Sequence, residues 1–319
     1  MRGGIVTPQS FRHEALMYSS ASEFIAGTVP FIREGVKAGE PVLVVESRDK
    51  IGALRAALGD DAERVIFSDM AEVGANPARI IPAWRDFVDA HAADGRPARG
   101  IGEPIWRGRT DDELVECQRH ESLLNVAFAR GQAWHLLCPY DTSELDESVI
   151  AEARRSHEFV REAGQAAKSA SYRGLDESAA TLDSPLGDPP SGARKVSFDR
   201  DRLLDVRREV MRFATAAGLD TGGATRLVTA VNEVATNSVV HGGGGGTLRI
   251  WRAGDTVVSE VRDSGSYRHA LADRIRPTAA SIDARGLWLA NQLCDLVQIR
   301  TLSDATLVRL HVKGAAGAN

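Results

Sequence analysis

The sequence predicts two folded domains, an α/β domain with a parallel sheet at 10–165 and an α+β sandwich at 194–315. The chain has 319 residues, a length that suits two domains of ordinary size. In the first part, apolar runs alternate with amphipathic segments, whereas the second part groups helical segments with hairpin-like strands. Residues 166–193 are rich in Ala, Ser, Gly, Asp and Pro and lack apolar periodicity, which indicates a linker.

The composition narrows the class of protein. Hydrophobic residues make up 43% and charged residues 26% of the chain, which is typical of a packed globular protein. The net charge of −5 argues against nucleic acid as the main partner, because binding phosphates needs clustered Lys and Arg. We find no apolar run long enough to span a membrane and no secretory signal at the start. We therefore expect a cytoplasmic protein that contacts neither membrane nor nucleic acid directly.

The cysteines and histidines show no metal-binding pattern along the sequence. Cys117, Cys138 and Cys294 lie far apart, without CxxC or Cys/His spacing, so we expect buried thiols in a reducing compartment. His13, His120 and His157 also lack ligand spacing, and structural or surface roles are expected for them.

The first domain is expected to alternate helices and strands. Its strands are expected at 41–47, 64–68, 100–106 and 133–140, and its helices at 20–38, 49–58, 77–93, 111–129 and 144–163. The run PVLVVES at 41–47 is continuously apolar, which is typical of a strand buried on both faces. Strands separated by helices predict a parallel sheet with helices on both faces.

The second domain is expected to combine a mainly antiparallel sheet with helices. Strands are expected at 195–199, 247–254, 256–265 and 306–313, helices at 201–218 and 222–242, and a helix running into a strand at 285–301. The close pair 247–254 and 256–265 predicts a hairpin.

Helix 222–242 carries the first candidate site residues. Glu233 and Asn237 are four residues apart, so they share one helical face. An Asn carbonyl oxygen suits Mg²⁺, and a carboxylate one turn away can polarise a hydroxyl or water. A solvated polar face is the alternative, because both residue types are common on helices.

Two further motifs follow in the chain. The strand 256–265 ends in Asp263-Ser264-Gly265, where a carboxylate can accept a hydrogen bond from an adenine amino group and Gly permits close approach. Gly286 opens an apolar helix, where free backbone N–H groups can face phosphate. A strand-end turn and a simple cap are the alternatives. For the glycine tract 242–246 there are two interpretations, a loop that binds phosphate or a flexible connection.

In order, the motifs NEVATN, RDSG and ARGL resemble the N, G1 and G2 boxes of the GHKL ATPases. In its compact size and in the motif NEVATNSVVHG, the domain resembles the anti-sigma-factor serine/threonine kinases within that superfamily. The resemblance covers 195–313 and implies the Bergerat-type α+β sandwich, with ATP and Mg²⁺ as cofactors. It also implies a sigma factor or an antagonist (anti-anti-sigma) protein as partner, and a homodimer.

The resemblance implies roles for individual residues. It makes Asn237 the Mg²⁺ ligand, Glu233 the general base and Asp263 the adenine partner, and segment 266–285 the ATP lid. Nucleotide contacts are further implied at Gly265, Arg285, Gly286, Leu287 and Thr306. A solvated surface position is the alternative for Arg285.

Two positions depart from the family pattern. Ala284 stands where a Gly is usual in the phosphate loop, and Ala305 stands where a Gly usually precedes Thr306. A Cβ at either position crowds the nucleotide or forbids a positive φ. ATP binding is therefore expected more firmly than fast turnover.

The first domain resembles the MEDS sensory domains, which are related to the RecA/KaiC-like α/β fold. The resemblance rests on FIREGVKAGEPVLVVES and the later strand end HLLCPYD. In place of a P-loop the chain has ESRDKIGAL, so phosphate binding is not expected here. The family implies a small-molecule ligand, and the strand-end residues that would meet it are Glu46, Ser47, Glu103, Trp106, Cys138 and Tyr140.

Three functions follow from these readings. The first is a signal-responsive regulator that binds Mg-ATP, captures a sigma factor or antagonist protein and phosphorylates it on Ser or Thr. The second is a cytoplasmic histidine kinase, for which His157 is the nearest candidate phosphoacceptor. The third is an ATP-binding switch without kinase activity, which Ala284 and Ala305 would favour.

Overall fold

The computed structural model describes residues 11–92, 95–129, 131–175, 185–267, 271–277 and 285–314. The chain divides into two compact units, Met1–Leu182 and Asp183–Asn319, here called the N-terminal and C-terminal units. Among the described residues, no helix is long and apolar enough to cross a membrane.

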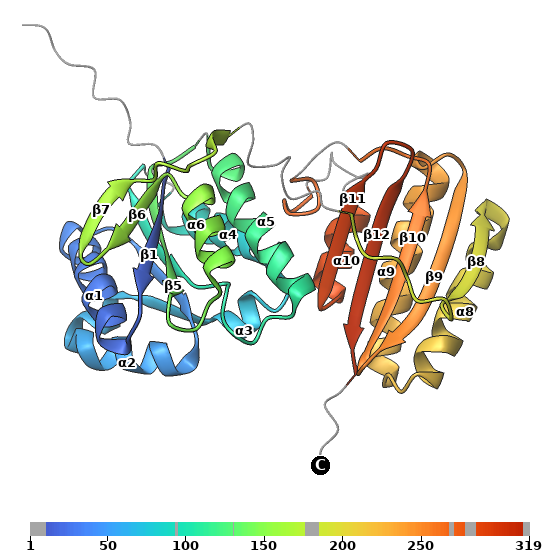
Figure 1. Ribbon diagram of the computed structural model, residues 1–319, viewed down its shortest axis with the longest axis horizontal. Helices are drawn as coiled ribbons and strands as arrows, with labels where there is room; N and C mark the ends of the chain where they lie inside the picture. The colour runs from blue at the N-terminus through green and yellow to red at the C-terminus, as the bar shows by residue number, and fades with distance from the viewer. Residues whose placement is uncertain are drawn as a thin grey trace, which may run out of the picture. The chain divides into compact units, whose positions relative to one another are not determined.

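The N-terminal unit is built on a seven-stranded mixed sheet with the order β3-β2-β4-β5-β1-β6-β7. Its strands are β1 (Arg12–Tyr18), β2 (Val42–Glu46), β3 (Ile66–Asp69), β4 (Ala98–Gly102), β5 (Trp134–Asp141), β6 (Phe159–Glu162) and β7 (Gln165–Lys168). All neighbouring pairs are parallel except β6 and β7, which pair antiparallel (Figure 1). The mixed sheet agrees with the expected α/β class, apart from this antiparallel edge.

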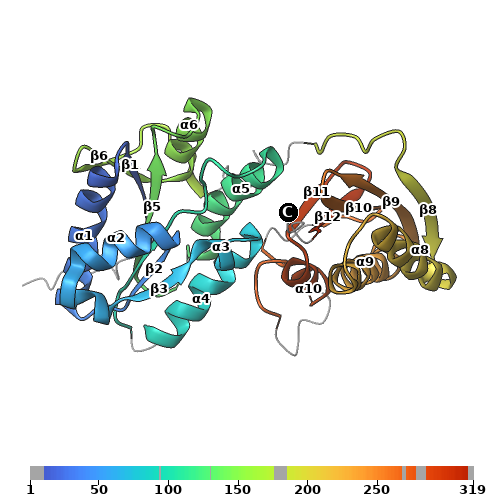
Figure 2. The same cartoon turned by 90° about the horizontal axis from the view of Figure 1, so that it is seen from below.

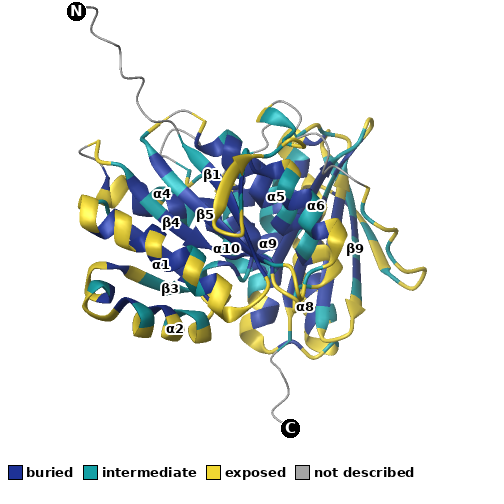
Figure 3. Cartoon of the chain, turned by 60° about the vertical axis from the view of Figure 1, so that its left-hand side comes forward, coloured by how far each residue is buried: buried dark blue, intermediate teal, exposed yellow. Residues whose placement is uncertain are grey.

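Helices cover both faces of this sheet (Figures 1 and 2). The helices are α1 (Ala21–Ala38), α2 (Arg48–Leu58), η1 (Gly59–Arg64), α3 (Met70–Val73), η2 (Pro77–Arg79), α4 (Ile80–His91), α5 (Asp111–Ala127) and α6 (Glu147–Ser156). Leu16, Val44 and Leu137 pack with α1 and α2 in one apolar cluster. On the opposite face Trp84 of α4 lies so close to the sheet that a Cβ on Gly100 would be 2.8 Å from its ring. Figure 3 shows β1, β4 and β5 buried, with exposed residues along the outer faces of α1 and α2.

Strand β1 was not predicted, although it lies inside the sheet between β5 and β6. Its first residues, Arg12, His13 and Glu14, hide the strand pattern because charged residues are rarely buried. Glu14 is nevertheless fully buried, where Arg161 Nε donates to it at 2.7 Å and His135 Nε2 lies 3.0 Å away. The ion pairs replace the lost hydration of the carboxylate and make a polar strand compatible with the interior.

The predicted helix 144–163 is wrong in its second half. Helix α6 ends at Ser156, and the chain then forms the hairpin of β6 and β7 through Ala163 (φ 48°) and Gly164 (φ 77°). This hairpin takes in residues expected in the linker. Arg173, which follows the hairpin, also contacts the N-terminal unit, because its side chain donates a hydrogen bond to Glu152 of α6 at 2.6 Å. The strands were missed because they have four residues each and β7 is exposed throughout.

The C-terminal unit is an α+β sandwich, as predicted. Its antiparallel sheet has the order β11-β12-β10-β9-β8. The strands are β8 (Arg194–Asp199), β9 (Gly245–Ala253), β10 (Thr256–Asp263), β11 (Leu296–Thr301) and β12 (Thr306–Lys313). The helices are η3 (Arg200–Arg202), α8 (Leu203–Ala216), α9 (Thr221–His241) and α10 (Arg285–Leu293), and the α-helices lie on one face of the sheet (Figure 2).

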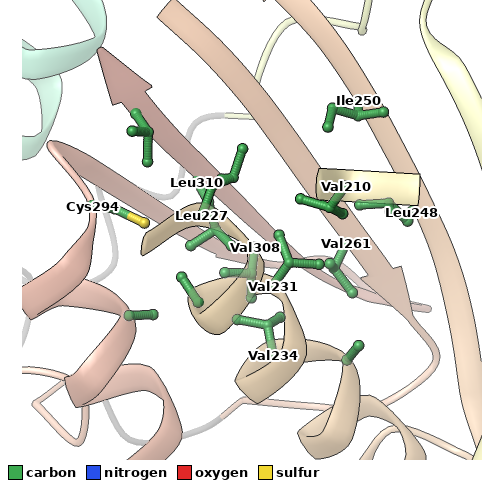
Figure 4. Packing of buried hydrophobic residues seen from close by; sticks show 14 of the residues in the cluster. Val210, Leu227, Val231, Val234, Leu248, Ile250, Val261, Cys294, Val308 and Leu310 are labelled. Carbon is green, nitrogen blue, oxygen red and sulfur yellow. The ribbon is translucent and has the colours of Figure 1, made fainter. Parts of the chain in front are cut away.

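Helix α9 provides the centre of the C-terminal core. Leu227, Val231 and Val234 recur at helical spacing and are almost fully buried. They pack against Val261 and Leu310 from the sheet, as Figure 4 shows. A neighbouring face of the helix remains partly exposed and carries Glu233 and Asn237.

We expect Leu227→Ala to lower the free energy of unfolding of the C-terminal unit by about 2–5 kcal/mol, because it leaves a cavity in the core. Differential scanning calorimetry of the full chain measures this as a lower melting temperature. Leu204→Ala is the matched control, since Leu204 is 46% exposed, and should change stability by less than about 0.5 kcal/mol. Equal effects of the two changes would contradict the packing described here.

We expect the contribution of Glu14 to stability to depend on pH. Burial raises its pKa, but His135, Arg161 and Arg12 together outweigh burial and lower the pKa from 4.5 to about 2. A carboxyl group with a depressed folded pKa stabilises the fold above its unfolded pKa, and this stabilisation disappears as pH falls from 4.5 toward 2. The melting-temperature gap between the wild type and Glu14→Gln should therefore be large at pH values above 4.5 and shrink below it. Glu34→Gln, at a side chain 70% exposed, should show no such gap.

Candidate functional site

Glu233 and Asn237 meet the start of α10. A Cβ built on Gly286 would lie 2.9 Å from Asn237 Nδ2 and 3.4 Å from Glu233 Oε2. The bare backbone of Gly286 is what allows α10 to begin so close to both side chains. The structure therefore brings the predicted helix face and the predicted glycine together.

Asp263 stands at the end of β10 on the same side of the sheet as the helices. It follows Val261, which points into the helix-covered core, by two residues. Ser238 Oγ of α9 donates to Asp263 Oδ2 at 2.6 Å, and the Gly265 backbone N–H donates to Oδ1 at 2.8 Å. Each carboxylate oxygen keeps a second lone pair, so the fixed side chain can still accept a hydrogen bond from a ligand.

The turn after β10 packs on the glycine tract after α9. A Cβ on Gly265 would lie 2.9 Å from Gly242 Cα, so this approach requires glycine. Ser264 N–H donates to the Gly242 carbonyl at 3.1 Å. Gly245 and Gly246 already belong to β9. Part of the tract thus packs against the turn that follows Asp263, so it has a defined structural role in addition to connecting α9 with β9.

The remaining residues predicted to contact the nucleotide differ in their surroundings. Thr306 is opposite Asp263 in the β10–β12 ladder, and its hydroxyl donates to the Gly265 carbonyl at 2.9 Å. Leu287 has its side chain in the apolar core, so only its backbone is left for a ligand. Arg285 is exposed at the first residue of α10.

The N-terminal unit brings two carboxyl groups together at the ends of neighbouring parallel strands. Glu46 ends β2, and Glu103 directly follows β4. Tyr18 Oη donates to Glu103 at 2.8 Å, and Lys50 pairs with the same carboxylate. Burial, followed by the nearby Glu103 charge, raises the pKa of Glu46 well above its ordinary value. The shift favours the protonated form of Glu46, which can donate a hydrogen bond.

The other residues expected at this crevice have different surroundings, and among them Ser47 and Cys138 lie close enough to interact with Glu46. Ser47 caps α2, where its side chain accepts from the Lys50 N–H. Trp106 is 37% exposed and stacks against Arg109. Cys138 and Tyr140 are buried, and the ring of Tyr140 contacts that of His157.

Both units match known protein families. Residues 12–158 match the family described as MEDS, the methanogen/methylotroph DcmR sensory domain. Residues 196–312 match the histidine kinase-like ATPase domain. The chain joins an N-terminal MEDS domain to a C-terminal histidine kinase-like ATPase domain.

Two solved structures show weaker likeness. The RsbU and RsbW domains of a Mycobacterium tuberculosis protein are 21% identical, with 39% of this chain and 33% of that chain covered and a TM-score of 0.31. The histidine kinase AdeS of Acinetobacter baumannii is 10% identical, with 39% and 68% covered and a TM-score of 0.27. A search of curated proteins found no match. This chain spans about a third of the length of the Mycobacterium tuberculosis chain.

One of the two departures from the GHKL pattern can be placed in the ATPase domain. Ala305 is buried just before β12, and its carbonyl accepts from the Leu302 N–H at 2.7 Å. Ala163 is the one non-glycine residue of the described chain with a positive φ, so Ala305 carries no such strain. Ala284 lies outside the described residues.

The expected lid of the ATPase domain is described only in part, since 268–270 and 278–284 lie outside the described residues. Within it, Asp273 is buried and accepts a hydrogen bond from Asn291 of α10 at 3.1 Å. Tyr267 Oη also donates to Asp273, at 3.2 Å. These contacts tie the described part of the segment to α10.

We expect Gly286→Ala to weaken Mg-ATP binding at least about tenfold, because its methyl group would press on Asn237 and Glu233. Isothermal titration calorimetry measures the dissociation constant. Gly222→Ala is the matched control, since its Cβ would meet only Asp220 Oδ1, at an ordinary 3.5 Å. Unchanged binding in Gly286→Ala, with the fold retained by circular dichroism, would contradict this arrangement.

Proposed function

We propose that this chain is a signal-responsive regulator. Its ATPase domain binds Mg-ATP and captures a sigma factor or an antagonist protein, which it phosphorylates on Ser or Thr. The observation that carries the proposal is the convergence of Glu233, Asn237, Asp263 and Gly286 within a domain of the histidine kinase-like ATPase family.

Asp263 is proposed to recognise the adenine. Its carboxylate is oriented by Ser238 and the Gly265 N–H, so little side-chain entropy is lost when a base binds. The adenine amino group is a donor and fits the lone pairs that remain. Gly265 and Gly242 let the two backbones approach each other, which holds the Asp263 carboxylate at the end of α9.

Asn237 and Glu233 are proposed to serve the phosphate end. The Asn237 amide oxygen suits Mg²⁺, which when bound neutralises charge on the phosphates. Glu233, one turn earlier, accepts the proton of the partner's Ser or Thr hydroxyl. That oxygen then bonds to the γ-phosphorus as the bond to ADP breaks. The new phosphate on the partner changes its charge and hence which protein it binds.

The MEDS domain is proposed to supply the signal by binding a small molecule near Glu46 and Glu103. The raised pKa of Glu46 favours its protonated form, which suits a ligand with a hydrogen-bond acceptor. A histidine kinase is the weaker alternative, because the candidate phosphoacceptor His157 is fully buried. ATP cannot reach a side chain in that position without local unfolding.

We expect the full chain to bind Mg-ATP with a dissociation constant between about 1 μM and 1 mM. Asn237→Ala and Asp263→Asn should each weaken binding about tenfold or more, since each removes a contact of about 1.5–3 kcal/mol that involves a charged group. Asn232→Ala is the matched asparagine control, because Asn232 is held by Arg207 on the surface. Asp255→Asn, at the far end of β10, is the matched aspartate control. Titration calorimetry showing no binding by the wild type would overturn the proposal.

We expect phosphate transfer to depend on Glu233. Affinity purification from lysate with and without ATP should retain a sigma factor or an antagonist protein, and labelled ATP should then mark that partner. Glu233→Gln should keep ATP binding and lower transfer at least about a hundredfold, the usual size of a general-base effect. Self-phosphorylation that is acid-labile, with labelled ATP alone, would favour the histidine kinase instead. ATP binding without transfer to any captured partner would indicate a switch without kinase activity.

A further inference from the structure

The MEDS domain contains a buried cluster of four potential metal ligands. His13 comes from β1, Cys138 from β5 and Glu121 from α5, and His157 directly follows α6. All four are almost fully shielded from solvent. One ligand atom from each lies within 4.8 Å of the others. The cluster is separate from the Glu46–Glu103 pair and from every residue assigned to the nucleotide.

The distances within the cluster fit the edges of a coordination tetrahedron. His13 Nε2 lies 3.1 Å from Glu121 Oε2 and 3.4 Å from Cys138 Sγ. His157 Nε2 lies 3.4 Å from the same Glu121 oxygen. Metal–ligand bonds of about 2.0–2.3 Å place tetrahedral ligands about 3.3–3.6 Å apart. Three of the six edges are therefore already close to this spacing.

The hydrogen bonds around the cluster fix the tautomers of both histidines. His157 Nδ1 lies 2.8 Å from the Ala153 carbonyl, to which it can only donate. Asn125 Nδ2 donates to the Ser156 carbonyl at 2.7 Å, so the Asn125 Oδ1 that lies 3.1 Å from His13 Nδ1 accepts from that ring. Both rings are thus protonated on Nδ1 and turn Nε2 toward the cluster. A carbonyl or amide oxygen holding the outer ring N–H is the usual support of a metal-bound histidine.

Within the cluster, the carboxylate of Glu121 faces the Nε2 atoms of both histidines. Among the described residues, the oxygens of Glu121 and Nε2 of His157 have no hydrogen bond of good geometry, although the Nε2 atoms of both histidines lie 3.1 and 3.4 Å from Glu121 Oε2. Acceptor atoms that converge in a buried site and lack good hydrogen bonds are costly unless a cation satisfies them.

We propose that His13, Glu121, Cys138 and His157 bind one Zn²⁺ ion, or a transition-metal ion of similar ligand preference. Two neutral imidazoles, one thiolate and one carboxylate form a ligand set typical of zinc. The two anionic ligands balance the charge of the ion. Because four protein ligands fill the coordination sphere and water is excluded, the ion has a structural or regulatory role and does not activate water.

The proposed ion would join β1 to elements far away in the sequence. It ties the start of the chain to α5, β5 and the end of α6. A metal bound there stabilises the folded MEDS domain, because the unfolded chain holds no preformed site. Binding also displaces the proton of the Cys138 thiol, so affinity rises with pH.

The first test is metal content and cobalt spectroscopy on the full chain. Purification without chelator should yield about one zinc per chain by plasma mass spectrometry. After the ion is removed, Co²⁺ should produce the intense thiolate-to-cobalt charge-transfer band in the near ultraviolet. Cys138→Ser should abolish this band and lower zinc affinity at least about tenfold, the size expected even for loss of a supporting contact. Cys117→Ser is the matched control, since Cys117 is equally buried but donates to the Pro104 carbonyl.

The second test covers the case in which a variant fails to fold. Zinc at a hundredfold excess over its dissociation constant should raise the melting temperature of the wild-type MEDS domain by about 5–10 °C. Glu121→Gln and His157→Gln should each lose most of this shift, while Cys117→Ser keeps it. A wild-type chain that is folded by circular dichroism yet shows no zinc, no melting shift and no charge-transfer band would overturn the proposal. So would a band of equal strength in Cys138→Ser.

Discussion

The hydrogen bond from Ser238 to Asp263 joins the two elements on which the ATPase site depends. It is 2.6 Å long and connects helix α9, which carries Glu233 and Asn237, to the end of strand β10. The bond forms because the turn after β10 can approach the end of α9, and this approach requires glycine at both 242 and 265. Without the contact, the proposed adenine partner and the proposed magnesium ligand would lie on separately oriented elements.

The same contact lies at the edge of the apolar layer between the helix and the sheet. The apolar residues of α9 fix its depth on the sheet, and Ser238 continues that buried side by one turn. Gly286 then allows α10 to start beside Asn237. Core packing and the candidate site are therefore parts of one arrangement, because the same helix supplies both on neighbouring faces.

The MEDS domain differs in that ionisable side chains are buried inside it. Strand β1 carries His13 and Glu14 on opposite faces of the sheet. On one face Glu14 is neutralised by Arg161 and its neighbours. On the other face His13 meets Glu121, Cys138 and His157, where the carboxylate faces two imidazole rings and a thiol instead of an arginine. This asymmetry between the two faces is the physical reason for proposing a metal ion on the second.

Most elements of the ATPase domain could be predicted from the sequence, because its helices have a clear apolar stripe and its strands are flanked by turn residues. Strand β1 and the hairpin of β6 and β7 could not. In β1 the charges at 12–14 conceal a strand whose partners lie more than a hundred residues away. In the hairpin the strands are short and polar, and they are held by pairing at the sheet edge. Local pattern contains no information about such distant partners.

The sequence by itself determined the order of motifs, since NEVATN, RDSG and ARGL are local and each depends on residue type and short spacing. It also determined which face of α9 is apolar. Only the tertiary structure decided that Asp263 turns toward α9 and that Leu287 enters the core while Thr306 bonds to Gly265. It alone brought together His13, Glu121, Cys138 and His157, because the register of parallel strands and the packing of helices set distances that spacing along the chain does not encode.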